Sequence, residues 1–202
     1  MMCSSSSARS WSGNGNKSKN ALRIVRPGAG AADRHDDFAR DTKSGACVGR
    51  AERLQLGEWG FELVASLAPE RDQSGAIIEY SPQGRYQRAG TIPLHKHGHG
   101  TFCKFRINVP AAQAGVYALV VDGDVRYVGE CDDLRERFNT GYGIISPRNC
   151  YAGGQMTNCK INRRVLDVSK AGNGVDVYFH PSSQRRSVEA RLIEQYSPPW
   201  NG

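Results

Sequence analysis

The sequence predicts an α+β fold, and three patterns in its second half support this. Two apolar runs flanking an Asp-Gly pair predict a β-hairpin, apolar residues at helical spacing predict three helices, and the run 175–180 predicts another strand. From residue 115 the expected order is strand, strand, helix, helix, strand, helix. We place these elements in one unit, residues 111–202, behind a smaller β-rich or α+β unit, residues 50–110.

The hairpin prediction rests on the run Ala118-Leu119-Val120-Val121, which is followed by Asp122-Gly123 and a second short run. Asp-Gly between β-prone runs favours a tight turn. On either side lie the triplets Gly115-Val116-Tyr117 and Tyr127-Val128-Gly129. A hairpin would bring the two tyrosines close together, which by itself is more often aromatic packing than chemistry.

After the hairpin, Asp132 and Asp133 suit the positive N-terminus of a short helix whose Leu134 and Phe138 face the core. Residues 139–156 are rich in Gly and Asn and predict a long loop. A second helix is expected to start at Thr157 or Asn158.

The last helix should be capped by Ser182 or Ser183, bury Val188, Leu192 and Tyr196, and end before Pro198. Glu189 lies next to this apolar stripe. A carboxylate there is partly withdrawn from water, so it needs a partner if it is to stay charged.

The first half of the chain is less informative. Residues 1–49 are rich in Ser, Gly and basic residues and predict a disordered basic tail. Apolar residues become frequent from about Gly57. The run 77–80 resembles a strand, and the alternation over 101–109 predicts another.

The net charge of +7 is uneven, because residues 1–50 hold nine Lys and Arg against four Asp. Overall basicity is therefore weak evidence for nucleic acid. No apolar run is long enough for a membrane span. The six cysteines form no CxxC pair and predict reduced thiols, so we expect a cytoplasmic protein without a membrane partner.

Three further residues complete a pattern with the tyrosines: Arg137 follows Tyr127 by ten positions, Glu189 lies on the last helix, and Asn201 follows it by twelve. Each alone has an ordinary structural explanation, such as an ion pair or a helix-end hydrogen bond. In this order and spacing, together with Asp133-Leu134 and Pro198, the set over residues 115–202 resembles the GIY-YIG nucleases, including the excision-repair incision subunit and restriction and homing enzymes.

The resemblance implies that the protein hydrolyses a DNA phosphodiester bond with one divalent cation, Mg²⁺ or Mn²⁺. Arg137 would bind the phosphate oxygens, because a guanidinium stays charged and forms paired hydrogen bonds. Glu189 would be the metal ligand, since Mg²⁺ keeps several waters. Tyr117 would orient the attacking water or take its proton, Tyr127 would position phosphate or water, and Asn201 would order the site.

Two positions depart from the family. Some relatives carry a histidine four residues after the arginine, where this chain has Gly141. The excision-repair relatives have a lysine where this chain has Glu130, which we interpret as an anion at a helix start in preference to a metal-shell group.

Other residues suggest nucleic-acid contacts. Arg148, Lys160, Arg163 and Arg164 cluster in and after a specialised loop, 146–160, and carry side chains suited to phosphates. His95, His97 and His99 alternate along a Gly-rich stretch, where phosphate contact is favoured over metal binding. A zinc site at Cys150 and Cys159 is the less favoured interpretation of that pair.

The sequence therefore favours a metal-dependent DNA endonuclease of restriction or defence type, with residues 50–110 helping recognition. The alternatives are a nucleic-acid-binding module without catalysis and a repair or mobile-element nuclease selective for branched DNA. DNA is the expected partner. No stable protein partner is evident, and a homodimer remains open.

Overall fold

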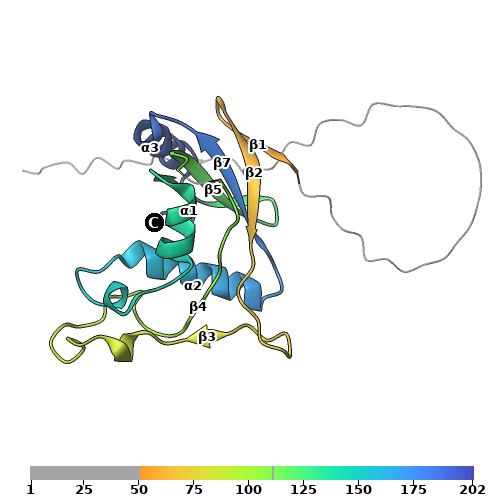
Figure 1. Cartoon of the computed structure of the whole chain (residues 1–202). Helices are drawn as coiled ribbons and strands as arrows, with labels where there is room; N and C mark the ends of the chain where they lie inside the picture. The colour runs from red at the N-terminus through yellow and green to blue at the C-terminus, as the bar shows by residue number, and fades with distance from the viewer. Residues whose placement is uncertain (1–50, 111) are drawn as a thin grey trace, which may run out of the picture.

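A computed structural model describes residues 51–110 and 112–202, and its centre is a five-stranded antiparallel sheet (Figure 1). The strand order is β1-β2-β7-β5-β6. The bounds are Arg53–Leu56 for β1, Trp59–Leu67 for β2, Val175–Pro181 for β7, Gly115–Val121 for β5 and Asp124–Cys131 for β6. The expected disordered tail, 1–49, lies outside the described residues.

The predicted hairpin is confirmed as β5 and β6. Val121 pairs with Asp124, so Asp122 and Gly123 form a two-residue turn in which both have positive φ, 53° and 85°. That backbone matches the twist of the flanking strands and suits Asp-Gly. A bulge between Leu119 and Val120 shifts the register, so that Tyr127 pairs with Leu119.

The sheet runs across the expected boundary at residue 110. β1 and β2 pair with each other, and β2 then pairs with β7, which lies between β2 and β5. Residues 53–67 are thus two more strands of the same sheet as the hairpin (Figure 1). The division of function between residues 50–110 and 111–202 stays a prediction.

The alternation over residues 101–109 is real, but most of this segment forms no ladder. Only β4, Phe102–Cys103, pairs with β3, Glu79–Tyr80. The rest is extended, with Phe105, Ile107 and Val109 buried. Side chains replace a partner strand, since Asn139 bonds both the N–H and the C=O of Ile107 at 2.7 and 3.0 Å.

The described residues contain three α-helices, and two of them begin elsewhere than expected. α1, Leu134–Glu136, has Asp133 as its N-cap, accepting from the Glu136 N–H at 3.0 Å as predicted. α2, Met156–Lys170, begins before Thr157. α3, Arg185–Tyr196, follows Gln184 with no side-chain cap, so the cap assigned to Ser182 or Ser183 is wrong. Ser182 instead accepts from the Gln184 N–H at 3.1 Å.

The prediction of a continuous loop over 139–156 is also wrong. α1 continues into a π-helical segment, η2, Arg137–Tyr142, and a 3₁₀ turn, η3, Pro147–Cys150, follows. The π character is set by the Gly143 N–H, which donates to the Phe138 carbonyl five residues earlier at 2.6 Å. Glycine and asparagine enrichment did not reveal this segment.

Each face of the sheet has its own core. On one face Tyr117, Leu119 and Phe179 pack against Leu134 and Phe138 of α1 and η2 and against α2. On the other face the strands pack against α3, through Val116, Ala118, Val128, Val188 and Leu192. The helices on opposite faces can therefore meet only around a sheet edge.

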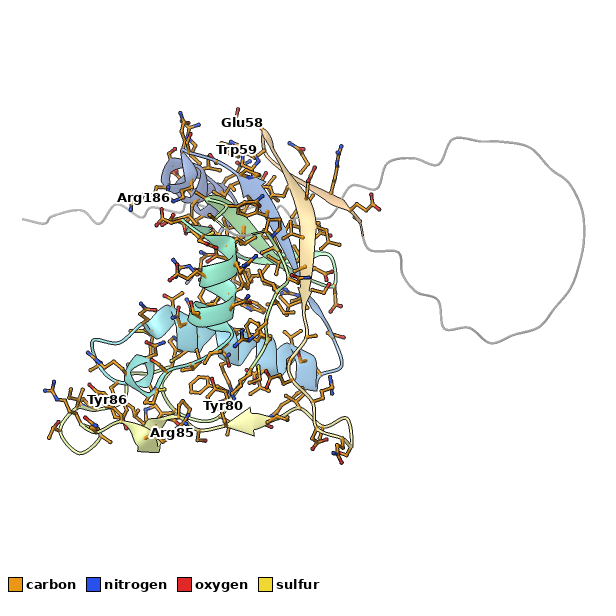
Figure 2. All side chains as sticks on the ribbon, in the orientation of Figure 1. Glu58, Trp59, Tyr80, Arg85, Tyr86 and Arg186 are labelled. Atoms are coloured by element: carbon orange, nitrogen blue, oxygen red, sulfur yellow. The ribbon has the colours of Figure 1, made fainter. Side chains whose placement is uncertain are left out.

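A third, smaller core lies below α2. The segment that carries β3 and the 3₁₀ turn η1, Gln83–Arg85, runs beneath α2 (Figure 1). Tyr80 and Tyr86 lie along it (Figure 2). The Tyr80 hydroxyl accepts from the Ile145 N–H at 2.6 Å, and the Tyr86 ring packs on Tyr151 with centroids 4.7 Å apart. Within the described residues no helix has the length and apolar character to cross a membrane.

Candidate active site

Tyr117 lies directly opposite Gly129 in the β5–β6 ladder, and the absence of a side chain at Gly129 makes room for its ring. A Cβ at residue 129 would lie 2.5 Å from the Tyr117 hydroxyl and 2.7 Å from Tyr127 Cε1. Gly115 serves a similar purpose, because a Cβ there would overlap the His180 carbonyl and the Phe179 ring. Gly129 is thus required by close packing on the two tyrosines, and Gly115 by close packing on the neighbouring strand β7.

The Tyr117 side chain is buried within a cluster of aromatic rings. Its hydroxyl hydrogen-bonds the Tyr142 hydroxyl at 2.6 Å. Its ring meets Phe138 edge-on at 5.2 Å and lies 6.2 Å from Tyr127, centroid to centroid. The structure therefore brings the two predicted tyrosines together and adds a third phenol.

Arg137 lies beside these phenols. Its guanidinium carbon is 5.6 Å from the centroid of the Tyr142 ring, a cation–π arrangement. Burial opposes its charge, but Tyr117, Tyr142, Cys131 and Tyr127 together raise the pKa of Arg137 above its ordinary value. The group is therefore a permanent cation inside an aromatic site.

Tyr142 is the site residue that the sequence analysis missed. It lies five residues after Arg137, a spacing that points to different faces in an α-helix but to one face in a π-helix, whose bonds join residues five apart. The position four after Arg137, Gly141, carries no side chain, and Tyr142 supplies a hydroxyl nearby. A tyrosine at that spacing would have been a usable signal only if the π-helix had been expected.

Glu189 lies on α3, which covers the opposite face of the sheet from Tyr117. It reaches the site around β6, the edge strand, where its carboxylate accepts a hydrogen bond from the Glu130 N–H. Burial and the Glu130 carboxylate raise the pKa of Glu189, while Arg137 lowers it. Because Glu189 also acts on the pKa of Tyr127, it shares an electrostatic environment with the residues on the other face.

Asn201 binds the same edge of β6. Its Oδ1 accepts from the Val128 N–H at 2.9 Å and its Nδ2 donates to the Val128 carbonyl at 2.7 Å. The Trp200 N–H donates to the Arg126 carbonyl at 2.8 Å. Because both polar groups of Asn201 are used on the backbone, it is a positioning residue that holds β6 between Tyr127 and Gly129.

The protonation of the phenols limits what they can do. Burial raises the pKa of Tyr117 and of Tyr142 well above the usual 10. Burial also raises the pKa of Tyr127, but hydrogen bonds with Tyr142 and Tyr117 and the charge of Arg137 oppose this rise. All three phenols therefore keep their protons at neutral pH, so the expected role of Tyr117 as a proton acceptor fits this environment poorly.

A polar cavity of about 350 Å³ opens beside Arg137. Gln155, the residue preceding α2, lies on its wall, so the start of α2 faces the same space as Arg137. Its lining comprises Cys131, Asp132, Asp133, Glu136, Arg137, Thr140, Gly141 and Gln155. Three of these side chains are carboxylates, and Arg137 is the one cation among them.

Glu130, expected at a helix start, has a different role. It pairs with Arg185, the first residue of α3, at 2.6 Å, and Arg185 also pairs with Asp132. Glu130 thus fixes the start of α3 against β6, and through it the position of Glu189.

The residues predicted to bind nucleic acid divide into two groups. Lys160, Arg163 and Arg164 line one cavity of about 330 Å³. Arg148 is not among its lining residues. Its guanidinium lies 5.8 Å from the Tyr86 ring centroid and donates to the Ala152 carbonyl at 2.9 Å, so it holds its own loop together.

The histidine and cysteine clusters give no metal site in residues 51–110 and 112–202, where no group of three or more His, Cys, Asp or Glu side chains could hold an ion. His95 is structural: its Nδ1 accepts from the His97 N–H at 3.1 Å, so Nε2 carries the proton and donates to the Asn149 carbonyl. Cys150 and Cys159 are buried thiols, and the Cys159 thiol donates to the Asn149 carbonyl at 3.4 Å.

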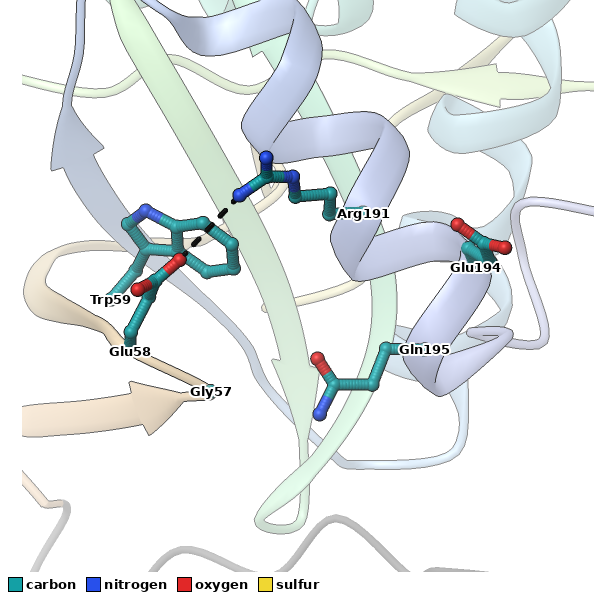
Figure 3. A pocket seen from close by; sticks show the side chains of 6 residues that line it. All are labelled: Gly57, Glu58, Trp59, Arg191, Glu194 and Gln195. Carbon is teal, nitrogen blue, oxygen red and sulfur yellow. Dashed lines mark ion pairs between the residues drawn. The ribbon is translucent and has the colours of Figure 1, made fainter.

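Another cavity lies between the β1–β2 turn and α3 (Figure 3). Arg191 and Glu58 form an exposed ion pair of 3.7 Å across it, beside Trp59. The cavity lacks the phenols and the buried carboxylate of the Arg137 site. It marks the contact between the β1–β2 turn and α3. The Gly57 N–H stabilises this contact by donating to the Tyr196 hydroxyl at 2.7 Å.

No model of a known protein family matches the chain, and no curated protein matches it. A solved structure of a point mutant of bacteriophage T4 EndoII is similar to part of it. The identity is 16%, the match covers 55% of this chain and 87% of that one, and the TM-score is 0.36. A likeness this low carries no argument about activity, so a function has to be argued from the residues themselves.

Proposed function

We propose that this protein is a divalent-metal-dependent endonuclease that hydrolyses phosphodiester bonds in DNA. The observation that supports this best is the convergence of Arg137, Tyr127 and Glu189, which come from opposite faces of the sheet and affect one another's charge around the edge of β6. A permanent cation and a carboxylate whose charge the protein compensates poorly suit phosphodiester hydrolysis, in which negative charge develops on the phosphate.

Arg137 binds the phosphate in this proposal. The attacked phosphodiester gains negative charge on its non-bridging oxygens, and a guanidinium can donate to two of them at once. The raised pKa keeps Arg137 charged at every useful pH. The cavity at its side gives the phosphate a route of approach.

The residues present fit a single divalent cation held by Glu189. The pKa of this carboxylate is raised by burial and by Glu130, so its negative charge is poorly compensated in the protein alone. A hard cation that keeps most of its waters needs few protein oxygens. When bound, Mg²⁺ or Mn²⁺ would supply positive charge for the phosphate and the leaving oxygen.

The phenols position the attacking water in this proposal. Hydrolysis joins a water oxygen to phosphorus and breaks one P–O ester bond, so the water loses a proton and the leaving oxygen gains one. Tyr127 orients the water in this proposal: burial raises its pKa too, so the phenol keeps its proton, and the proton that the water loses passes to solvent. Beside it, the Tyr117 and Tyr142 hydroxyls share a hydrogen bond of 2.6 Å, and the Tyr127 ring lies 6.2 Å from the Tyr117 ring, centroid to centroid.

A restriction or defence role is favoured over the two alternatives. A binding module without catalysis would have no use for the poorly compensated Glu189 carboxylate beside Arg137. A nuclease selective for branched DNA uses the same chemistry and differs in its preference for junctions. Residues 50–110 contribute to recognition of the target in this proposal.

Incubation of the protein with plasmid DNA and Mg²⁺ or Mn²⁺ tests the proposal. Wild type is expected to nick or linearise the plasmid only with the metal, and Glu189→Gln is expected to lose this activity while still folding. Glu194→Gln, an exposed glutamate on the same helix, is the matched control. Absence of cutting on varied DNA, or equal cutting by Glu189→Gln, refutes it. Preferential cutting of four-way junctions selects the repair alternative.

A further inference from the structure

We infer that the basic cavity along α2 binds the backbone phosphates of duplex DNA beside the cutting site, and that residues 96–99 form half of this site. The choice of duplex DNA rests on the proposed function, whereas the assignment of phosphate binding does not. We name this cavity the basic groove, and its lining comprises Lys96, His97, His99, Lys160, Arg163, Arg164 and Asp167.

The basic groove joins two distant stretches of chain. Lys96 and the two histidines come from the loop before β4, and the other residues come from the solvent-facing side of α2. Four cationic side chains line the groove with one carboxylate, Asp167, which is paired with Arg163 at 3.2 Å, while Lys160 Nζ donates to the Gly202 oxygen at 3.2 Å. The groove therefore carries more cationic side chains than its one carboxylate can neutralise.

The positive charges in the groove repel one another, and this contributes to a lowered pKa at two of its residues. Burial lowers the pKa of Lys160, and Lys96 and Arg164 lower it further. Burial also lowers the pKa of His97, with Lys96, Lys160, His95 and Arg164 adding to the effect. Cations that lower one another's pKa are stabilised when an anion enters, and the loop and helix α2 that converge on the groove give that anion a defined position.

The histidine loop is held rigidly enough to form a binding wall. The His95 N–H donates to the Cys150 carbonyl at 3.1 Å, and Gln83 Nε2 donates to the carbonyls of Gly98 and Gly100 at 2.8 and 2.6 Å. Gly98 packs so closely on the Cys150 backbone that a Cβ there would overlap it. The backbone is thus fixed, while Lys96 and His99 remain exposed.

The spacing along α2 connects the basic groove to the active site. Gln155 lies in the wall of the Arg137 cavity, and Arg163 lies eight residues further along the chain. Eight helical residues rise about 12 Å. One strand of B-DNA places a phosphate roughly every 3.4 Å along its axis, so the groove would meet phosphates about three to four base pairs from the site of cutting.

Measurements of DNA binding under conditions that prevent cleavage test this inference. Anisotropy with a labelled DNA duplex of mixed sequence in Ca²⁺ or EDTA gives the affinity and its salt dependence. Lys96→Ala and Arg164→Ala are each expected to weaken binding several-fold for every sequence and to reduce the slope of log K against log salt by about 1. Arg191→Ala, an exposed arginine on α3, is the matched control and should bind as wild type does.

The outcomes separate this inference from the proposed function. Unchanged affinity and slope in both groove variants, an equal loss in Arg191→Ala, or no duplex binding by wild type overturns the inference, even if Mg²⁺-dependent cutting is present. A specific loss in the groove variants supports it, even if no metal gives cutting. Tighter binding of a single-stranded RNA of the same length would overturn duplex DNA as the ligand.

Discussion

Arg137 and Tyr142 lie on one face of a π-helical segment, with the guanidinium carbon 5.6 Å from the centroid of the phenol ring. In an α-helix, residues five apart differ by about 140° around the axis. The wider turn of the π-helix reduces this offset, and the Tyr142 hydroxyl hydrogen-bonds the Tyr117 hydroxyl at 2.6 Å. The π-helical segment therefore adds a third phenol, Tyr142, to the site, although the position four residues after Arg137 is a glycine.

We first predict that Tyr142→Phe reduces DNA cleavage by about tenfold or more while the fold survives. The change removes the 2.6 Å hydrogen bond to the Tyr117 hydroxyl and leaves a buried phenol without its partner. Its cost in unfolding free energy should be about 1–2 kcal/mol. Initial rates of plasmid nicking and urea unfolding measure the two effects.

The control for this variant is Tyr151→Phe. The Tyr151 hydroxyl donates to the Gln83 carbonyl at 2.9 Å, so this variant also loses one hydrogen bond of a buried tyrosine, away from the phenol cluster. A similar loss of stability with unchanged cleavage is expected. Equal cleavage by Tyr142→Phe and wild type would show that the third phenol only packs.

A second prediction concerns Gly129→Ala. The added Cβ would lie 2.5 Å from the Tyr117 hydroxyl. The Tyr117 ring cannot easily move away, because its residue is paired directly with residue 129 in the β5–β6 ladder. Overpacking of this kind costs about 1–3 kcal/mol. Urea unfolding should show this loss, and cleavage should fall further than stability alone explains. Gly90→Ala, where a Cβ meets nothing within 4 Å, should leave both properties unchanged.

Much of the site was predictable because its parts follow short-range rules. The Asp-Gly pair fixes the hairpin, and the hairpin register places Tyr117 against Gly129. Asp133 caps α1 and so sets the start of the turn that carries Arg137. The position of Glu189 could be anticipated only as partly buried, since its path around the edge of β6 depends on strand order.

Other features could not be predicted because distant contacts decide them. The roles of β1 and β2 as strands of the main sheet depend on pairing between β2 and β7, more than a hundred residues apart in the chain. The π-helix arises where residues after Arg137 are held by the extended segment through Asn139. Arg148 has a side chain suited to phosphate, but its guanidinium contacts the Tyr86 ring and donates to the Ala152 carbonyl.

The third prediction concerns Asn201, whose amide bridges both polar groups of Val128. Asn201→Ala removes two hydrogen bonds and should cost about 1–3 kcal/mol of unfolding free energy. Amide hydrogen exchange at Val128 should accelerate relative to that at Ala118, which lies in the ladder interior. If exchange at Val128 stays unchanged, Asn201 does not hold this edge in solution.

The fourth prediction is a gain of stability in Glu189→Gln. Because the pKa of Glu189 is raised above its ordinary 4.5, the folded state binds the proton more tightly than the unfolded state. The ionised carboxylate therefore costs stability at neutral pH, and the cost disappears below about pH 4. Glutamine keeps an acceptor for the Glu130 N–H without the charge.

In EDTA at pH 7.5, Glu189→Gln should melt about 1–3 °C above wild type, and the difference should vanish at pH 4. Added Mg²⁺ should raise the melting temperature of wild type alone, because only the carboxylate holds the ion. Glu194→Gln should behave as wild type throughout. A Mg²⁺-dependent rise that persists in Glu189→Gln would place the metal elsewhere.

The last prediction is that DNA binding strengthens below pH 6.5 through His97. In the free protein, burial and neighbouring cations lower the pKa of His97 from 6.5, so the side chain is neutral at pH 7.5. A phosphate in the basic groove favours the imidazolium, and binding should then take up a proton as pH falls through this region. Affinity for a duplex should rise by up to about tenfold between pH 7.5 and pH 5.5.

His97→Ala should flatten this rise, whereas His180→Ala, whose ring binds the Gly60 carbonyl away from the groove, should leave it intact. A rise of equal size in wild type and His97→Ala would assign the proton to another group.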